Sequence, residues 1–299
     1  MNIKIKIPAT SANLGPGFDT LGLALDLWNE TIVTPANEFS VTVSGEGEGR
    51  LTKGRNNLIV RAAQKLADHV QKALPPFHAD CVNQIPLSSG LGSSAAAILT
   101  GLLAGNALLE KPLSDGDVLN LAAVMEGHTD NVAPALMGGL VVSTMNDGRV
   151  IARHIPFEQY MHITIALPDF YLPTKQARAA LPRKTSMKNA IHNISHTVLL
   201  TEAFRTGDFS LLGEVMTDKL HQAYRLKLIP GAQSAMEAAR DAGASAVALS
   251  GAGPSVIAFS SKAETGIGEA MKRAFEELGL STRIFNLGIS GQGAEIQIK

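Results

Sequence analysis

The sequence predicts an α+β protein in two parts, and three observations lead to this prediction. In the first half, a block of short strands and one helix precedes a helix that carries no charge. In the second half, split strands alternate with crossing helices, which is typical of a ferredoxin-like αβ sandwich. The 299 residues are 45% hydrophobic and 18% charged, a composition of globular proteins with one large or two medium domains.

Composition also limits which binding partners and which cellular compartment are expected for the protein. The formal net charge is −1 and like charges do not cluster, so neither nucleic acid nor an anionic membrane is an expected partner. A single cysteine, Cys81, excludes an internal disulfide and favours a reducing compartment. Within the first ten residues, MNIKIKIPAT, Ile and Lys alternate over residues 3–7, which is typical of a strand rather than a signal peptide. We therefore expect a cytoplasmic protein.

The first half is predicted to begin with strands and to continue with helices. Apolar residues from Leu58 to Val70 recur at helical spacing, so a helix from Asn56 or Asn57 is expected to reach about residue 73. A second helix follows Ser93, and a third is capped by Ser114. The expected strands cover residues 3–9, 21–33 (as one or two strands), 39–44, 78–84 and 140–145, and the third helix covers residues 114–126.

The second half shows no low-complexity linker before it, so the boundary is placed near residue 155. This division predicts an N-terminal domain of residues 1–155 and a C-terminal domain of residues 156–299. A strand expected over residues 150–156 comes before this half, and the strands expected within it cover residues 162–168, 246–249, 256–260, 282–287 and 294–298. The expected helices cover residues 174–181, 186–204, 209–221 and 231–241, with a last one ending at 278.

A charge-free Gly/Ser loop, PLSSGLGSSAA at residues 86–96, precedes the buried helix. Gly90 and Gly92 permit a sharp turn, and Ser93 and Ser94 stand at the helix start, where free N–H groups and the positive dipole end bind phosphate without a lysine. A plain buried helix after a turn is one alternative. A dinucleotide fingerprint is another, since the loop fits G-x-G-x-x-A, but the helix does not return into a strand that ends in an acidic residue.

Two polar turns are the other candidate site segments. The turn SANLGPGFD at residues 11–19 offers the side-chain oxygens of Asn13 and Asp19, which could instead bond their own backbone. The segment EGHTDN at residues 126–131 places five polar groups in six positions. A carboxylate there and a serine of the Gly/Ser loop could hold Mg²⁺, although a solvated loop fits the pattern too. The glycine turn at 250–255 leads into a strand and permits close approach of backbone.

Taken together, these segments resemble the motifs of the GHMP kinases. The Gly/Ser loop looks like the phosphate loop of that family, the turn at 249–255 like its third motif, and the other two segments follow in the expected order. The resemblance spans nearly the whole chain. It implies an N-terminal domain like ribosomal protein S5 domain 2, a C-terminal ferredoxin-like sandwich, a possible homodimer, and transfer of the γ-phosphoryl group of ATP, with Mg²⁺, to a substrate hydroxyl.

The resemblance also implies which residues hold ATP and the metal ion. The Gly/Ser loop would wrap the phosphates, Ser94 (or Ser93) and Glu126 would hold Mg²⁺, and Asn57 would lie by the adenine. The loop residues concerned are Pro86, Leu87, Ser88, Ser89, Gly90, Leu91, Gly92, Ser93, Ser94, Ala95 and Ala96.

For the acceptor, the motifs are similar to the branch of the family that acts on L-homoserine. An amino acid needs an acidic group for its ammonium and arginine for its carboxylate. Asp19 would meet the ammonium, and Arg178 and Arg225 the carboxylate. Asn13, His128 and Thr174 complete the expected substrate site. The alternatives are a mevalonate-like or sugar kinase of the same fold and a non-catalytic nucleotide-binding regulator.

The expected catalytic group comprises Asn131, His128 and Asp130. Phosphoryl transfer passes through a loose transition state, in which positioning and charge neutralisation matter more than deprotonation. We therefore expect Asn131 to orient the acceptor hydroxyl without a dedicated base. The alternative is that Asp130 acts as the base.

Overall fold

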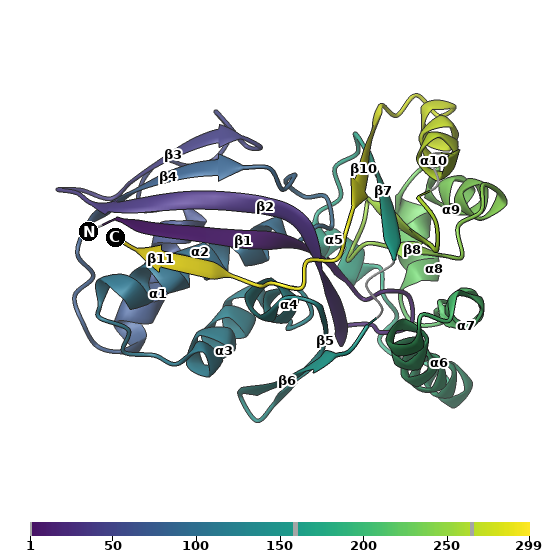
Figure 1. Cartoon of the computed structure of the whole chain (residues 1–299), viewed down its shortest axis with the longest axis horizontal. Helices are drawn as coiled ribbons and strands as arrows, with labels where there is room; N and C mark the ends of the chain where they lie inside the picture. Colours follow the sequence, from purple (N-terminus) through teal and green to yellow (C-terminus); the bar gives the residue numbers. More distant parts are fainter. Residues whose placement is uncertain (1, 158–160, 264–265) are drawn as a thin grey trace.

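The computed structural model describes residues 2–157, 161–263 and 266–299, and it contains two sheets that lie side by side (Figure 1). The first sheet has the order β11-β1-β2-β4-β3, and β5 pairs with β2 and β6. Among the strands of this sheet in the described ranges, only β3 and β4 pair in parallel. Its strands are β1 (Ile3–Ala12), β2 (Leu21–Pro35), β3 (Ser40–Gly45), β4 (Phe77–Asn83), β5 (Leu140–Asn146), β6 (Arg149–Ile155) and β11 (Glu295–Ile298).

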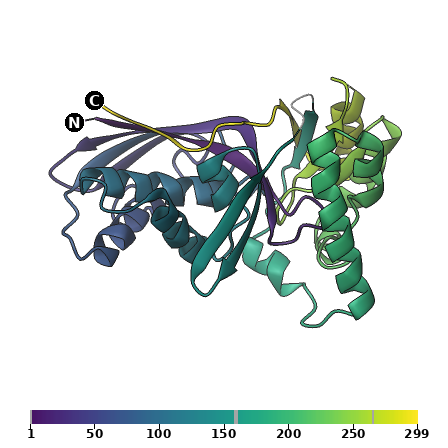
Figure 2. The same cartoon turned by 60° about the horizontal axis from the view of Figure 1, so that its bottom comes forward.

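Four helices accompany the first sheet, and both views show them together on one of its faces (Figure 1, Figure 2). The central helix α2 is apolar on all sides, as a helix packed on all sides must be. A Cβ at Gly101 would lie 2.1 Å from the Ile59 carbonyl oxygen, so glycine permits the close approach of α1. The helices are α1 (Leu58–His69), α2 (Ser93–Leu108), α3 (Asp115–Glu126) and α4 (Val132–Met137).

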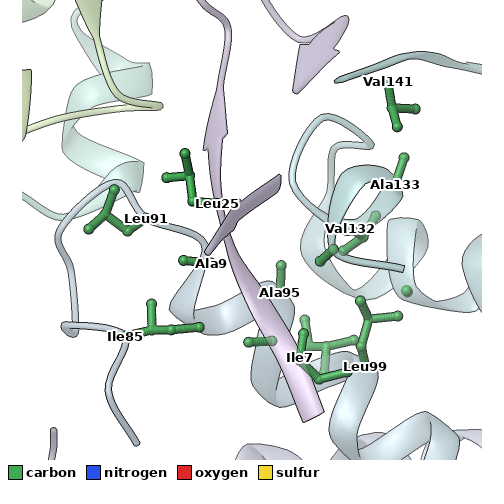
Figure 3. Packing of buried hydrophobic residues seen from close by; sticks show 14 of the residues in the cluster. Ile7, Ala9, Leu25, Ile85, Leu91, Ala95, Leu99, Val132, Ala133 and Val141 are labelled. Atoms are coloured by element: carbon green, nitrogen blue, oxygen red, sulfur yellow. The ribbon is translucent and has the colours of Figure 1, made fainter. Parts of the chain in front are cut away.

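The hydrophobic core of this half lies between the sheet and these helices. Ile7 of β1 lies beside Leu99 of α2, with Ala95 of α2 close by, and Leu25 of β2 and Val132 of α4 belong to the same cluster (Figure 3). All five side chains are buried. The start of α2 and the start of α4 are therefore held against the same strands, which brings the two polar segments beside them close together.

The second sheet has the order β10-β7-β9-β8, with every pair antiparallel. The order places the first strand of this half in the interior and confirms the ferredoxin-like prediction. Its strands are β7 (His162–Pro168), β8 (Ala246–Leu249), β9 (Val256–Ser260) and β10 (Thr282–Leu287). Its helices are α5 (Thr174–Ala179), α6 (Met187–Thr206), α7 (Phe209–Val215), α8 (Gln222–Arg225), the 3₁₀ helix η1 (Leu226–Leu228), α9 (Ala232–Asp241) and α10 (Gly266–Glu276).

Two segments tie the halves together. The loop between β1 and β2 reaches into the second half (Figure 2), where Asn193 Nδ2 donates to the Pro16 carbonyl oxygen at 2.9 Å. The last strand, β11, returns to the first sheet and pairs with β1. Before it, the Ala294 N–H donates to the Leu136 carbonyl oxygen of α4 at 3.1 Å.

Some predicted element bounds are corrected by the structure. The helix expected over 209–221 ends at Val215, and α8 begins only at Gln222, because the Asp218 carboxylate accepts the N–H groups of His221 and Gln222 at 2.8 and 2.6 Å and turns the chain. The short helix α4 was not predicted; its proline stands in the first turn, where the missing N–H costs little. The described residues contain no helix that is long and apolar enough to cross a membrane.

Candidate active site

Two cavities meet at the Gly/Ser loop, where Ser88, Ser93 and Ser94 line both. The first, here called the polar cavity, has a volume of about 170 Å³. Its other lining residues are Asn13, Asp19, Ser89, Gly90, Gly92, Glu126, His128, Asp130, Asn131, Thr174, Arg178, Arg225, Gly251 and Ala252. All the residues that the sequence predicted for the substrate and for catalysis are therefore brought together.

The second, here called the apolar cavity, has a volume of about 410 Å³. It lies between α1, the start of α2 and the strands β2, β3 and β4. Asn57 lines it, but its amide is already engaged: Oδ1 accepts from Ile59 N at 2.9 Å and Nδ2 donates to the Thr52 carbonyl at 2.7 Å. Its other lining residues are Asn29, Thr31, Val43, Arg50, Leu51, Thr52, Asn56, Leu58, Ile59, Cys81, Asn83, Leu87, Ala97 and Thr100.

The Gly/Ser loop is held in place by the glycine turn of the second half. Ser250 Oγ donates to the Gly90 carbonyl oxygen at 2.7 Å. A Cβ at Gly90, where φ is 79°, would lie 2.2 Å from the Ser250 carbonyl oxygen, so only glycine fits. Gly92 stands at the N-cap of α2 with φ 74°, and having no side chain it leaves the first N–H groups of the helix open toward the cavities.

Not every residue of the loop faces a cavity. Leu91, Ala95 and Ala96 are buried in the hydrophobic core (Figure 3 labels Leu91 and Ala95). Pro86 lines a neighbouring hollow, which it shares with Leu87. Leu91, Ala95 and Ala96 therefore support the loop from the side of the hydrophobic core. The serines and glycines of the loop line the polar cavity.

Ser94 and Glu126 both line the polar cavity, and their side chains are in direct contact. Ser94 Oγ donates to Glu126 Oε1 at 2.5 Å, and the two residues belong to different helices, α2 and α3. A hydroxyl and a carboxylate are oxygen donors of the kind that Mg²⁺ takes, together with water and phosphate oxygens. The donor set therefore fits a magnesium ion between this pair and a phosphate at the start of α2.

His128 lies between two carboxylates. Its Nδ1 is 2.7 Å from Asp130 Oδ1, and its Nε2 is 3.8 Å from Glu126 Oε1. Burial alone would lower the pKa of His128, but the Asp130 hydrogen bond and the charges of both carboxylates outweigh it and raise the pKa. The ring thus holds Asp130 in place and offsets negative charge beside Ser94 and Glu126.

Asn131 is the residue before α4, and its side chain makes no hydrogen bond to the N–H groups at the start of that helix. Thr10 Oγ1, on β1, donates to Asn131 Oδ1 at 2.7 Å, and both residues are buried. The Asn131 side chain also lines the polar cavity, so the hydrogen bond to Thr10 orients an amide that faces the open space.

Asp19 and Arg178 form an ion pair between the two halves. Two hydrogen bonds join them, Nη1 to Oδ2 at 2.9 Å and Nη2 to Oδ1 at 2.7 Å. The Asp19 N–H donates to Asn13 Oδ1 at 3.0 Å, and Asn13 Nδ2 donates to the Gly251 carbonyl oxygen at 2.9 Å. Asn13 therefore fixes the backbone on which the ion pair stands.

Arg225 is a buried cation, with only 1% of its surface exposed. Its Nη1 donates to the Gly251 carbonyl at 2.9 Å, and its Nε has no hydrogen-bond partner within the described ranges. Burial and the neighbouring charge of Arg178 lower the pKa of Arg225 to about 10. A guanidinium in such a place stabilises the binding of an anion in the polar cavity.

Phe18 and His221 complete the surroundings of the two arginines. The guanidinium carbons of Arg225 and Arg178 lie 5.2 and 5.9 Å from the centre of the Phe18 ring. Burial lowers the pKa of His221, and its Nε2 donates to the Gly15 carbonyl at 2.8 Å, so its Nδ1 can accept from Arg225 Nη1 at 3.3 Å. The neutral ring thus adds no charge to the cavity.

Sequence reasoning missed two parts of this site. Thr10 carries no signal of its own, because one threonine in an apolar strand is ordinary. The walls of the apolar cavity are strand residues such as Thr31, Val43 and Cys81, which the sequence pattern assigns to the core. Only the pairing of β2, β3 and β4 could have brought them to one place.

Comparisons with known proteins agree with this fold. The family model described as "GHMP kinases N terminal domain" matches residues 57–139, and "GHMP kinases C terminal" matches residues 200–292. A homoserine kinase of Moorella thermoacetica is 43% identical, covering 98% of this chain and 99% of its own. A homoserine kinase of Deinococcus radiodurans is 39% identical, covering 98% and 96%. The crystal structure of homoserine kinase from Cytophaga hutchinsonii superposes with a TM-score of 0.88 at 31% identity, covering 99% and 97%.

Proposed function

The chain belongs to the GHMP kinase family, and from this premise we propose that it transfers the γ-phosphoryl group of ATP to the side-chain hydroxyl of L-homoserine. The product is O-phospho-L-homoserine, an intermediate of threonine biosynthesis. One observation carries the choice of acceptor: the polar cavity holds a carboxylate, Asp19, beside two guanidinium groups, Arg178 and Arg225. This charge set matches the ammonium and carboxylate of an amino acid.

ATP fits across the two cavities. The apolar cavity suits an adenine, which is flat and largely apolar, and the N-terminus of α2 suits the phosphates. The cavities share Ser88, Ser93 and Ser94, so the phosphate chain would pass from one cavity to the other over these serines. The γ-phosphate would then face the polar cavity.

Ser94 and Glu126 are the residues that would hold Mg²⁺ in this arrangement. When bound, the ion neutralises negative charge on the phosphate oxygens. The hydrogen bond that joins Ser94 and Glu126 in the structure would open to admit it. His128 would continue to hold Asp130 and would offset part of the remaining negative charge.

The acceptor would lie over Phe18, in the loop between β1 and β2, with its ammonium and carboxylate at the ion pair of Asp19 and Arg178. Arg225, a buried cation without a carboxylate bound to it in the described residues, would take the substrate carboxylate together with Arg178. Asp19 would take the ammonium. Thr174, at the start of the helix that carries Arg178, would bond the acceptor from the same wall.

The transfer itself breaks the bond between the γ-phosphorus and its bridging oxygen and forms a bond to the homoserine oxygen. Asn131 would hold that oxygen in line, ADP would leave with the bridging oxygen, and the hydroxyl proton would pass to an oxygen of the transferred phosphoryl group as the new bond forms, without a dedicated base. Positioning suffices because the transition state is loose. Asp130, held by His128 at 2.7 Å, is the alternative acceptor of the proton.

The test is ADP release with L-homoserine, with mevalonate, with galactose and with no acceptor. We expect rapid release with homoserine alone and a phosphorylated product of the corresponding mass. A preference for mevalonate or galactose would assign another acceptor to the same fold. ATP binding without any acceptor-dependent release would indicate a regulator, and the proposal would then be wrong.

A further inference from the structure

We propose that Thr10 is a positioning residue for this transfer: its hydroxyl decides which end of the Asn131 amide faces the polar cavity. The inference rests on the proposed function, since it concerns how the acceptor hydroxyl is oriented. It assigns a role to a buried residue of β1 that lines neither cavity.

The Thr10 side chain is enclosed on several sides. It is fully buried, and its N–H donates to the Leu91 carbonyl oxygen at 3.1 Å. A Cβ at Gly92 would lie only 2.1 Å from Thr10 Oγ1. The hydroxyl is thus packed against the Gly/Ser loop on one side and bonded to Asn131 Oδ1, at 2.7 Å, on the other.

The direction of that hydrogen bond follows from the cost of burying an unpaired donor. If the Asn131 amide donated to Thr10 Oγ1, the buried hydroxyl proton would lose the acceptor that the structure provides, at a cost of about 1–3 kcal/mol. Donation from Thr10 to Asn131 Oδ1 avoids this cost. The Asn131 amide nitrogen, which can only donate, is therefore the end left for the polar cavity.

A donor in this position suits the transfer. A hydrogen bond from Asn131 Nδ2 to the acceptor oxygen occupies one lone pair and turns another toward the γ-phosphorus. The Thr10 N–H also donates to Leu91 of the Gly/Ser loop. Thr10 therefore contacts both the loop proposed to bind the phosphates and the amide proposed to bind the acceptor hydroxyl. Their separation is thereby fixed by β1.

Thr10→Val keeps the shape of the side chain and removes only the hydroxyl, and Thr10→Ser keeps the hydroxyl. Ser11→Ala is the matched control: Ser11 is equally buried, and its hydroxyl forms a hydrogen bond with Ser250 Oγ at 2.9 Å without touching Asn131. Each variant is measured for kcat, for KM of both substrates and for Tm, alone and combined with Asn131→Ala.

We expect Thr10→Val to lower kcat by about 10- to 100-fold, with both KM values changed less than about threefold. Thr10→Ser should retain kcat within about threefold, and Ser11→Ala should lower Tm without a comparable loss of kcat. In the Asn131→Ala background, Thr10→Val should cost nothing further, because the amide it positions is absent.

Three outcomes would overturn the inference. They are an unchanged kcat with a lowered Tm in Thr10→Val, an equal loss of kcat with and without Asn131, and a wild-type kcat in Asn131→Ala. The third outcome would also remove the role proposed for Asn131, but none of them bears on the identity of the reaction, which depends on homoserine-dependent ADP release by the unmodified protein.

Discussion

Arg178 and Asp19 hold each other through two parallel hydrogen bonds, although 159 positions separate them in the chain. About a third of each side chain is exposed, so both remain accessible from the polar cavity. An acceptor that carries an ammonium and a carboxylate can replace both members of the pair with new partners. An acceptor with a carboxylate alone would leave Asp19 without its cation and beside a second anion.

The first prediction concerns acceptor choice. We expect the unmodified protein to prefer L-homoserine over 4-hydroxybutyrate, which lacks the ammonium, by about 100-fold or more in kcat/KM, a difference typical of sites built to bond a missing group. Asp19→Asn should narrow this preference to about tenfold or less. Asp241→Asn, which changes charge on an exposed part of α9, is the control. An unchanged preference in Asp19→Asn would contradict the assignment of the ammonium to Asp19.

The second prediction concerns the metal ion. Because Ser94 bonds Glu126 at 2.5 Å, Ser94→Ala and Glu126→Gln should each raise the Mg²⁺ concentration needed for half-maximal activity, by about tenfold or more. Ser93→Ala should raise this Mg²⁺ concentration less. Titrating the activity of each variant against Mg²⁺ compares the two serines directly. A larger shift in Ser93→Ala than in Ser94→Ala would transfer the role to Ser93.

The third prediction separates Asn131 from Asp130 by single-turnover kinetics with bound ATP. Asn131→Ala should slow phosphoryl transfer by about 100-fold, since it removes an aligned donor. Asp130→Asn should slow it less, through the loss of a partner for His128. If only Asp130→Asn abolished transfer while ATP still bound, Asp130 would be the base.

The fourth prediction concerns stability and pH. Asp218 accepts N–H groups of His221 and Gln222 and the Asn193 amide at 2.7 Å. Burial alone would raise the pKa of Asp218, but the neighbouring His221 and these hydrogen bonds lower it. A lowered pKa stabilises the fold above the unfolded value of about 3.9, and this contribution is lost as the pH falls through the folded pKa.

Asp218→Asn should therefore lower the free energy of unfolding by about 2 kcal/mol at pH 6. The difference from the unmodified protein should shrink as the pH falls from about 4 through the lowered folded pKa, below which both proteins carry a neutral side chain at this position. Urea unfolding at several pH values measures it, with Asp241→Asn as the matched control. A difference that is independent of pH would show that shape rather than charge matters at Asp218.

Much of the fold could be predicted because its signals are local. The Ser114 cap, the apolar character of α2 and the strand–helix alternation of the second half each arise from neighbouring residues. The segment 209–221 misled the prediction because its helical spacing is real, whereas the break depends on the Asp218 carboxylate and its contact with Asn193. That contact joins residues 25 positions apart, which periodicity does not reveal.

The candidate site divides in the same way. Its loops were found because glycines, serines and ionisable groups cluster in sequence. The binding of Asp19 to Arg178 and of Thr10 to Asn131 depends on how distant strands and helices meet. Residue types predict which groups can do chemistry, and packing decides which group each one faces.

The return of β11 to the first sheet has a consequence for synthesis. During translation, β6 leaves the ribosome about 140 residues before β11, which at about 5–20 residues per second is a delay on the order of ten seconds. Throughout that time β1 has β2 on one side and an unpaired edge on the other. An open edge is a template for pairing with another chain, so the nascent first half is the stage at which we expect chaperones to matter most.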